Sequence, residues 1–283
     1  MFGFLNVYKP KGKTSHDVVA ILRRVTKIKQ IGHTGTLDPF AEGVLPICIG
    51  KATRLIEYLK DDKAYVATVQ FGASTSTYDI EGDVVKTSDK NIELSDIEPA
   101  LDKFRGEIEQ LPPIYSAIKV NGKKLYEYAR KGEEVEIKPR KVTINELKIV
   151  GFDPEKRQLE LYVDCSKGTY IRSIANDLGE VLGVFGHLVK LIRVKAGSFL
   201  IDKAIKLEEL ESKEIVQSNL IYPLEYLDYP KYEISELEKI KVANGNALHL
   251  DCEDGLILLT YGETLAAVAE IAQGKAVMRK VFL

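Results

Sequence analysis

The sequence contains no tryptophan, only two methionines, three cysteines and four histidines in 283 residues. The cysteines, Cys48, Cys165 and Cys252, are odd in number and far apart, and none belongs to a C-x-x-C pair, so neither a disulfide framework nor a zinc site is indicated. Cys48 and Cys165 stand in apolar, strand-like segments, where a free thiol acts as a small core residue. The histidines lack the spacing of metal ligands. We therefore expect a protein that uses no metal and no cofactor.

Long apolar runs are also missing. No stretch approaches the roughly 18 consecutive apolar residues of a membrane-spanning helix, and residues 1–12 lack the charged start and apolar middle of a secretion signal. With 45% hydrophobic residues the chain can build a core, and its length favours one large or two unequal domains. These features predict a cytoplasmic protein with no membrane partner.

The net charge of −2 argues against a chain that coats nucleic acid along its whole length, but the charges are unevenly distributed. Residues 1–60 hold ten basic and four acidic side chains, residues 61–112 hold five and twelve, and residues 119–141 hold eight and four. Such segregation is typical of a localised phosphate-binding face. Solvated surface helices would give the same counts, so charge alone leaves both interpretations open.

One carboxylate, Asp38, lies in a loop of small and rigid residues, GHTGTLDPFAEGVLP, over positions 32–46. Gly32 and Gly35 allow backbone angles closed to other residues, and Pro39 fixes its own φ and has no amide to donate. A stiff loop around one acid indicates a positioned reactive group. The alternative is a tight turn in which Asp38 only accepts hydrogen bonds from nearby amides.

The pattern of apolar residues indicates the fold class. Alternation predicts half-buried strands over residues 63–71 and 159–165. Residues 14–17 match the start of a capped helix, which apolar positions over 18–25 continue at helical spacing. A further helix is expected after Gly168. Since strands and helices interleave without regular βαβ units, we predict an α+β fold with a mixed, mainly antiparallel sheet flanked by helices.

The character of the chain changes near Tyr222-Pro223 and Tyr229-Pro230. A short helix is predicted over residues 235–243, and strand-like segments follow over 256–260, 265–269 and 276–283. We therefore predict a main domain over residues 1–225 and a small β-barrel domain over residues 226–283.

The loop that carries Asp38 resembles the catalytic motif of the TruB-type tRNA pseudouridine-55 synthases, in which the aspartate is the essential catalytic residue. The resemblance continues in the family's order through KPKGKTSHDVV, LPPIYSAIKVNGKKLYEYAR, CSKGTYIRSIANDLG and HLVKLIRVKAGSF. Residues 75–82 also resemble a T-x-T-x-D-x-x-G element of the family. The resemblance implies a pseudouridine synthase fold, isomerisation of the T-loop uridine at position 55 of tRNA, and a C-terminal PUA-like RNA-binding domain.

The resemblance also implies roles for individual residues. Asp38 would be the catalytic carboxylate, and Arg172, at the start of a helix, would pair with it. A cation in the first turn of a helix is opposed by the helix dipole, so a carboxylate partner would compensate it. Tyr65 would stack on the flipped uracil and is one candidate to take the C5 proton, a step that the sequence does not assign to a single group. Tyr170 and Leu191 match positions that line the same pocket, and His33 matches a residue that enters the space left by the flipped base. For these residues core packing or a structural role in the loop is the alternative.

RNA contacts are expected mainly from basic residues of the motif blocks. An RNA-gripping insertion is implied over residues 114–141, where cations alternate with tyrosines, although a plain amphipathic segment would look similar. Ile192 replaces an arginine common in the family, which removes one expected cation. The predicted RNA-binding side chains are Lys9, Lys119, Lys123, Lys124, Arg130, Lys190 and Arg193.

Other functions remain open at this level. A glycosidase would use Asp38 and Glu42 as a carboxylate pair, but Pro39 and Gly43 make the required geometry doubtful, and there is no tryptophan to bind a sugar. A non-catalytic RNA chaperone would not need Asp38. A catalytic subunit of a guide-RNA particle is the remaining alternative. The absence of basic tails favours a stand-alone monomer that acts on the T-arm stem-loop of tRNA without a protein partner.

Overall fold

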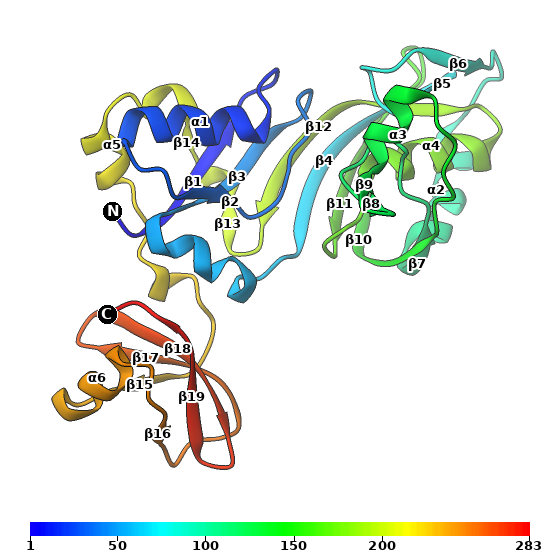
Figure 1. The fold of residues 1–283 in the computed structure, drawn as a ribbon. Helices are drawn as coiled ribbons and strands as arrows, with labels where there is room; N and C mark the ends of the chain where they lie inside the picture. The colour runs from blue at the N-terminus through cyan, green and yellow to red at the C-terminus, as the bar shows by residue number, and fades with distance from the viewer.

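The computed structural model describes residues 1–283 and builds most of them around one mixed sheet of ten strands (Figure 1). Two of the strands pair outside the main path: β2 (Ile31–His33) with β3, and β13 (Phe199–Leu200) with β12. The main path runs through β14 (Ile205–Lys206), β1 (Gly3–Lys9), β3 (Glu42–Ile49), β12 (Gly186–Ala196), β4 (Lys63–Phe71), β11 (Gln158–Cys165), β10 (Arg140–Asp153) and β7 (Gly106–Gln110).

Most neighbouring strands of this sheet are antiparallel. Only β1 with β14 and β3 with β12 run parallel. The alternation that predicts half-buried strands is seen in β11, where Leu159, Leu161, Val163 and Cys165 are buried and the residues between them are not. The predicted α+β class with a mixed, mainly antiparallel sheet is confirmed.

The helices cover the sheet in two groups (Figure 1). At one end lie α1 (Ser15–Thr26) and α5 (Lys213–Ser218), and at the other lie α2 (Leu94–Leu101) and α4 (Ile171–Leu182). Thr14 caps α1 through a reciprocal pair of hydrogen bonds with Asp17, as the sequence predicts. A Cβ on Gly179 would lie 2.2 Å from the amide nitrogen of Gly186, so this glycine permits the close approach of α4 to β12.

Two smaller elements lie between strands of the large sheet. The hairpin of β5 (Ala73–Thr75) and β6 (Val84–Thr87) follows β4 and carries Asp79 in its connection. The predicted insertion over 114–141 contains β8 (Lys119–Val120), β9 (Lys123–Lys124) and α3 (Leu125–Lys131), and it joins β7 to β10.

A second sheet forms the C-terminal part of the chain (Figure 1). Its order is β15 (Lys231–Glu233), β17 (Gly255–Tyr261), β18 (Thr264–Ala272), β19 (Lys275–Val281) and β16 (Leu248–His249), with α6 (Glu236–Ala243) beside it. This is the small β domain that the sequence predicts. No helix of the molecule has the length and apolar character needed to cross a membrane.

A hydrophobic cluster connects the two sheets. Phe4, Val44 and Phe199 of the large sheet pack in one buried cluster with Leu258 and Val268 of the C-terminal sheet. The hydrophobic core is therefore continuous between the two sheets. The domain boundary between residues 225 and 226 stays a prediction.

Candidate active site

A cavity of about 450 Å³ collects residues that are distant in the sequence. The loop after β2, strands β4 and β12, the insertion and the start of α4 all contribute to it. The cavity holds five of the residues predicted to act on the substrate: Asp38, Tyr65, Tyr170, Arg172 and Leu191. Its volume suits one small molecule or one nucleotide.

Asp38 and Arg172 form an ion pair in this cavity. The Nε atom of Arg172 lies 3.1 Å from Oδ2 of Asp38. The Arg172 side chain is 7% exposed, while 34% of the Asp38 side chain faces the cavity. Arg172 is the second residue of α4, where the helix dipole opposes a cation, and the carboxylate compensates this unfavourable position.

Asp79 is a second carboxylate on the same guanidinium, and the sequence did not single it out as a site residue. Its Oδ2 atom accepts a hydrogen bond of 3.0 Å from Nη1 of Arg172. Its Oδ1 atom accepts bonds from the Thr77 hydroxyl at 2.6 Å and from the Glu81 amide at 3.0 Å. The T-x-T-x-D-x-x-G element was the available signal, because it places Thr77 and Asp79 in one turn. A Cβ on Gly82 would lie 2.4 Å from the Thr77 hydroxyl oxygen, which explains the glycine that closes the element.

The terminal nitrogens of Arg172 also donate hydrogen bonds to backbone carbonyls. Nη1 also donates to the Thr77 carbonyl at 3.2 Å, and Nη2 donates to the Tyr115 carbonyl at 3.0 Å. Arg172 thus connects three loops: the one with Asp38, the β5–β6 connection and the insertion. Gln110 fixes the start of α4 from another side, since its side chain bonds both the amide and the carbonyl of Tyr170, at 2.8 and 3.0 Å.

The loop that carries Asp38 is anchored on both sides of the aspartate. The Ser15 hydroxyl accepts a bond of 2.8 Å from the Leu37 amide and donates one of 3.0 Å to the Leu37 carbonyl. The Gly12 amide donates to the Pro39 carbonyl at 2.8 Å. The loop therefore has little freedom to move Asp38 away from Arg172, as the glycine-proline pattern of the sequence predicts.

Two opposing effects act on the carboxyl of Asp38. Protein atoms surround the group although the cavity reaches it, and this burial raises the pKa of Asp38 above its ordinary value. The Arg172 guanidinium opposes that rise by stabilising the ionised form, and Arg193 and Lys9 add smaller contributions of the same sign. A carboxyl in a cleft whose pKa is raised by burial and lowered by a specific charged partner is characteristic of a reactive site.

Three apolar or aromatic side chains shape the cavity beside Asp38. Tyr65 on β4 is 7% exposed, and burial raises the pKa of its phenol. Leu191 on β12 is paired with Ala67 of β4 and is 5% exposed. Tyr170 precedes α4 and also lines the cavity. The Asp38 carboxylate therefore lies beside a wall of two tyrosines and one leucine, which suits the packing of a flat ring.

Lys63 is a further cation at the cavity that the sequence did not single out. It lies two residues before Tyr65 on β4, and its Nζ atom donates to the Asp61 carbonyl at 2.7 Å. Burial is the main cause that lowers its pKa, and Arg193 adds to the effect. The K-x-Y spacing on one strand was the signal for it.

His33 is not among the cavity residues. It ends β2, pairs with Ile47 of β3, and its ring packs edge-on against His16. Burial lowers the pKa of its imidazole, and Nδ1 has no partner. The neighbouring Thr34 does line the cavity, so His33 lies one residue away from its wall.

Two of the predicted RNA-binding cations, Lys9 and Arg193, lie in the interior and do not suit phosphate contact. Both are 0% exposed. The Lys9 ammonium donates to the Lys13 carbonyl at 2.6 Å and to the Pro39 carbonyl at 3.4 Å, and burial lowers its pKa to about 8. Arg193 donates only to backbone carbonyls. Both side chains donate to backbone carbonyls on either side of Asp38, and a side chain without exposed surface cannot reach an RNA backbone.

The other predicted RNA-binding cations lie outside the core. Lys119, Lys123 and Arg130 are exposed on the insertion, and Lys124 is half-buried there. Lys124 and Arg130 lie over the ring of Tyr126, which also lines the cavity. Lys190 is exposed on β12, but it lines a hollow with Thr68 and Glu160 rather than the cavity that holds Leu191. The alternation of β12 thus turns Lys190 to the opposite face of the sheet.

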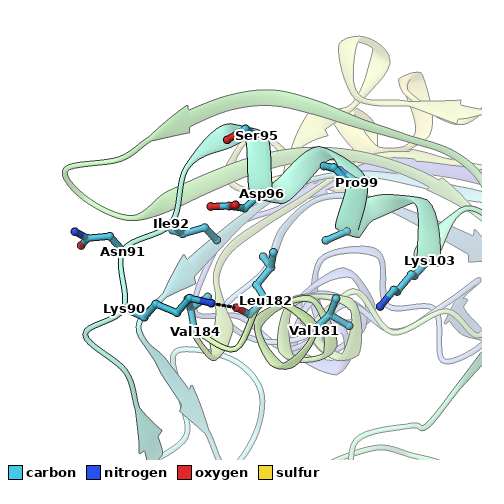
Figure 2. Close-up of a pocket in the computed structure, with 11 residues that line it drawn as sticks. Lys90, Asn91, Ile92, Ser95, Asp96, Pro99, Lys103, Val181, Leu182 and Val184 are labelled. Carbon is cyan, nitrogen blue, oxygen red and sulfur yellow. Dashed lines mark hydrogen bonds between the residues drawn. The ribbon is translucent and has the colours of Figure 1, made fainter.

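The residues of the competing interpretations are arranged differently. Glu42 begins β3 and does not line the cavity, so it does not form a carboxylate pair with Asp38 there. No group of three or more His, Cys, Asp and Glu side chains is arranged to hold a metal ion. A separate cavity of about 490 Å³ lies between α2 and α4 (Figure 2). Lys90, one of the residues that line it, donates to the Leu182 carbonyl at 3.1 Å, and none of the predicted site residues lines it.

Comparison with known proteins identifies the family of this chain. Residues 23–171 match the family model described as "TruB family pseudouridylate synthase (N terminal domain)", and residues 172–227 match "tRNA pseudouridylate synthase B C-terminal domain". The chain is 44% identical to tRNA pseudouridine synthase B of Caldanaerobacter subterraneus subsp. tengcongensis, over 98% of each chain. It is 47% identical to tRNA pseudouridine synthase B of Geobacillus thermodenitrificans, over 93% of this chain and 92% of the relative.

Solved structures share the fold at lower identity. A crystal structure of a Cbf5–Nop10–Gar1 complex matches with a TM-score of 0.74 and 27% identity, over 100% of this chain and 85% of that chain. An H/ACA RNP bound to a substrate RNA matches with a TM-score of 0.73 and 24% identity, over the same shares, and shows the fold alone. With family models matched over residues 23–227 and near-complete relatives above 40% identity, the chain belongs to the TruB family of pseudouridylate synthases.

Proposed function

We propose that this enzyme converts the uridine at position 55, in the T-loop of tRNA, into pseudouridine, with Asp38 as the catalytic carboxylate. Family membership supports the reaction, and the names of the relatives support tRNA as the substrate. The observation that carries the role of Asp38 is its ion pair with Arg172 inside a cavity of nucleotide size.

The reaction breaks the bond between N1 of uracil and C1′ of ribose, turns the base, and joins C1′ to C5. It consumes no energy source and changes no oxidation state, so the protein has to supply a carboxylate, a surface for the base and exclusion of water. In this proposal Arg172 keeps Asp38 ionised and oriented. Tyr65 stacks on the flipped uracil and takes the C5 proton, while Tyr170 and Leu191 hold the base against it.

The substrate is larger than the cavity, so part of the RNA must bind outside it. We propose that the exposed cations Lys119, Lys123 and Arg130 of the insertion grip the T-arm, with Lys124 beside them at Tyr126. Tyr115 belongs to the same insertion and is bonded to Arg172 through its carbonyl, so RNA contact and the catalytic ion pair share one segment. We propose a cytoplasmic enzyme that acts as a monomer without a protein partner.

A guide-RNA particle is the competing assignment, because a solved Cbf5–Nop10–Gar1 complex and an H/ACA RNP bound to a substrate RNA share the fold. The stand-alone assignment rests on the higher identity to the tRNA enzymes, 44% and 47%, compared with 27% for the Cbf5 complex. A non-catalytic RNA chaperone would have no need of a carboxylate held by a buried arginine.

The test is incubation of the purified chain with an unmodified tRNA transcript, followed by mapping of pseudouridine. We expect one modified position, in the T-loop, and no product from a matched transcript that carries cytidine there. The Asp38→Asn variant should bind the transcript with near-normal affinity and form no product. Product at another position would redefine the substrate, whereas product only with an added guide RNA would favour the particle. No product under either condition would contradict the proposal.

A further inference from the structure

Arg193 is the largest side chain with no exposed surface in the molecule. Its Nε atom donates to the Val44 carbonyl at 2.7 Å, and its two terminal nitrogens donate to the carbonyls of Thr36 and Gly35, at 3.2 and 3.1 Å. Unlike Arg172, it forms no ion pair with a carboxylate. A buried guanidinium without a carboxylate partner is unfavourable for folding unless its surroundings compensate the charge.

The three carbonyls belong to the two ends of the segment that carries Asp38. Gly35 and Thr36 precede the aspartate and line the cavity, and Val44 follows it on β3. The backbone of Arg193 also packs tightly against this segment, because a Cβ on Gly43 would lie 2.3 Å from the Arg193 carbonyl oxygen. The three nitrogens of one planar guanidinium therefore bond to both ends of the segment at once. A lysine has a single nitrogen and could not bond to all three carbonyls.

Arg193 also stands directly behind the cavity wall. It is the register partner of Tyr65 between β12 and β4. Asp38 and Tyr65 both feel its charge: burial, the largest effect, raises the pKa of each group, and Arg193 opposes the rise in each case. Its positive charge is thus directed at the two side chains that carry the proposed chemistry.

We propose that Arg193 is a positioning residue of the reaction, which fixes the loop that presents Asp38 and maintains a permanent positive charge behind the cavity wall formed by Gly35, Thr36 and Tyr65. This inference rests on the proposed function of Asp38. It replaces the contact with RNA phosphate that the sequence predicts for Arg193.

The proposal determines the direction of a pH effect. The charged and titratable groups around Asp38 are Arg172 of α4, Asp79 and Glu81 of the β5–β6 connection, Lys9 of β1, Tyr65 of β4 and Arg193 of β12. Activity requires ionised Asp38, so turnover falls as the pH drops through the pKa of this carboxyl. Removing the positive charge of Arg193 raises that pKa, and the fall then begins at a higher pH.

The experiment compares Arg193→Met, which removes the charge, with Arg193→Lys, which keeps the charge and loses the fork. Arg157→Lys is the matched control, because Arg157 also donates to two backbone carbonyls, those of Ser88 and Lys90, at 2.9 and 2.7 Å, and does not line the cavity. Each protein is assayed for turnover at saturating tRNA across pH, for KM, for the salt dependence of RNA affinity, and for a cooperative thermal melt.

We expect turnover of Arg193→Lys to fall by about tenfold to a hundredfold, the scale of a displaced catalytic group, with KM and the salt slope nearly unchanged. The acid limb of turnover should move to higher pH in Arg193→Met and stay in place in Arg193→Lys. The Arg157→Lys control should melt at a lower temperature with normal turnover and a normal pH profile.

Three results would overturn the inference while the wild-type enzyme remains active. Normal turnover of Arg193→Lys would show that the fork is not needed. If the slope of log RNA affinity against log salt fell by about one in either variant, Arg193 would contact an RNA phosphate as the sequence predicts. An equal loss of turnover in Arg157→Lys would show that Arg193 contributes only to the general stability of the fold. If Arg193→Met does not melt cooperatively, the comparison of the two lysine variants decides the question. An inactive wild-type protein would instead contradict the proposed function itself.

Discussion

The Oδ2 atom of Asp79 accepts a hydrogen bond of 3.0 Å from Nη1 of Arg172, and both side chains are almost completely removed from solvent, with exposed fractions of 3% and 7%. The arginine therefore stands between one carboxylate that is buried and another, Asp38, that faces the cavity. Asp79 is held by Thr77 and the Glu81 amide as well, so it is the fixed partner. Asp38 is bonded to the protein through Oδ2, which leaves its other oxygen available to substrate.

Asp79→Asn should impair catalysis more than RNA binding. The amide keeps the size of the side chain but removes the charge that compensates Arg172, so the guanidinium shifts toward Asp38. We expect turnover to fall by about a hundredfold, as for a small misplacement of a reacting group, with less than a threefold change in RNA affinity, roughly the resolution of such comparisons. Single-turnover kinetics with tRNA and a filter-binding assay measure the two quantities. Unchanged turnover would show that Thr77 and Tyr115 hold Arg172 well enough alone.

Arg172→Lys should lower turnover and stability together. Lysine keeps the charge but cannot reach Asp38, Asp79 and the Tyr115 carbonyl at the same time. We expect a fall in turnover of at least about a hundredfold and looser attachment of the insertion, seen as faster proteolysis between residues 114 and 141. Arg157→Lys serves as the control for a general loss of stability. Normal proteolysis with low turnover would mean that Arg172 acts on Asp38 without holding the insertion.

The sequence predicts the ion pair but not the network around it, and the reason is the distance along the chain. Asp38 stands out because its rigid loop is local, and Arg172 because a cation at a helix start needs compensation. The T-x-T-x-D-x-x-G element indicates a turn around Asp79, but its partner Arg172 lies 93 positions away and is brought to it only by folding.

Burial explains the predictions that do not fit. Lys9 and Arg193 have the composition of surface cations, and nothing local reveals that three backbone carbonyls surround each charge. Lys190 is exposed, but it is the immediate neighbour of Leu191 on β12, so the alternation along the strand turns it to the opposite face of the sheet. The fold class and the C-terminal strands follow from periodicity, which is a local property.

Tyr65→Phe should preserve RNA binding and lose the step that needs the hydroxyl. The phenylalanine keeps the shape and stacking surface of Tyr65 but has no hydroxyl through which the C5 proton could pass. We expect bound RNA that accumulates without release of pseudouridine, detected by stopping single turnovers and analysing the nucleoside. Tyr162→Phe, on β11 and outside the cavity, is the control. Full activity of Tyr65→Phe would leave this residue a stacking role only.

Lys63→Met should weaken RNA binding in a salt-dependent manner. The Lys63 ammonium lines the cavity and bonds only the Asp61 carbonyl, so a phosphate next to the flipped nucleotide would be its natural partner. Plots of log affinity against log salt should lose about one unit of slope. Lys148→Met is the control, because Lys148 is exposed on β10 and paired with Glu146. An unchanged slope in Lys63→Met would mean that this lysine only packs against Gly35.

The C-terminal sheet should melt together with the large sheet rather than separately. Val268 of β18 is 0% exposed in a cluster that also contains Phe4 of β1 and Val44 of β3. Val268→Ala removes buried methyl groups and should lower the free energy of unfolding by about 1–2.5 kcal/mol, in a single transition seen by both calorimetry and amide exchange of β1. Leu237→Ala, at a side chain that is 76% exposed, should change it little.

The same cluster predicts the effect of removing residues 226–283. The truncation exposes Phe4 and Val44, so we expect a lower melting temperature and weaker binding of full-length tRNA. All residues of the cavity lie upstream, so the truncated protein should still modify an isolated T-arm stem-loop. Affinity for full-length tRNA should depend more steeply on salt in the complete chain, because the tail would add phosphate contacts. Equal salt slopes would assign the C-terminal sheet a structural role, and loss of the cooperative melt would show that residues 1–225 do not fold alone.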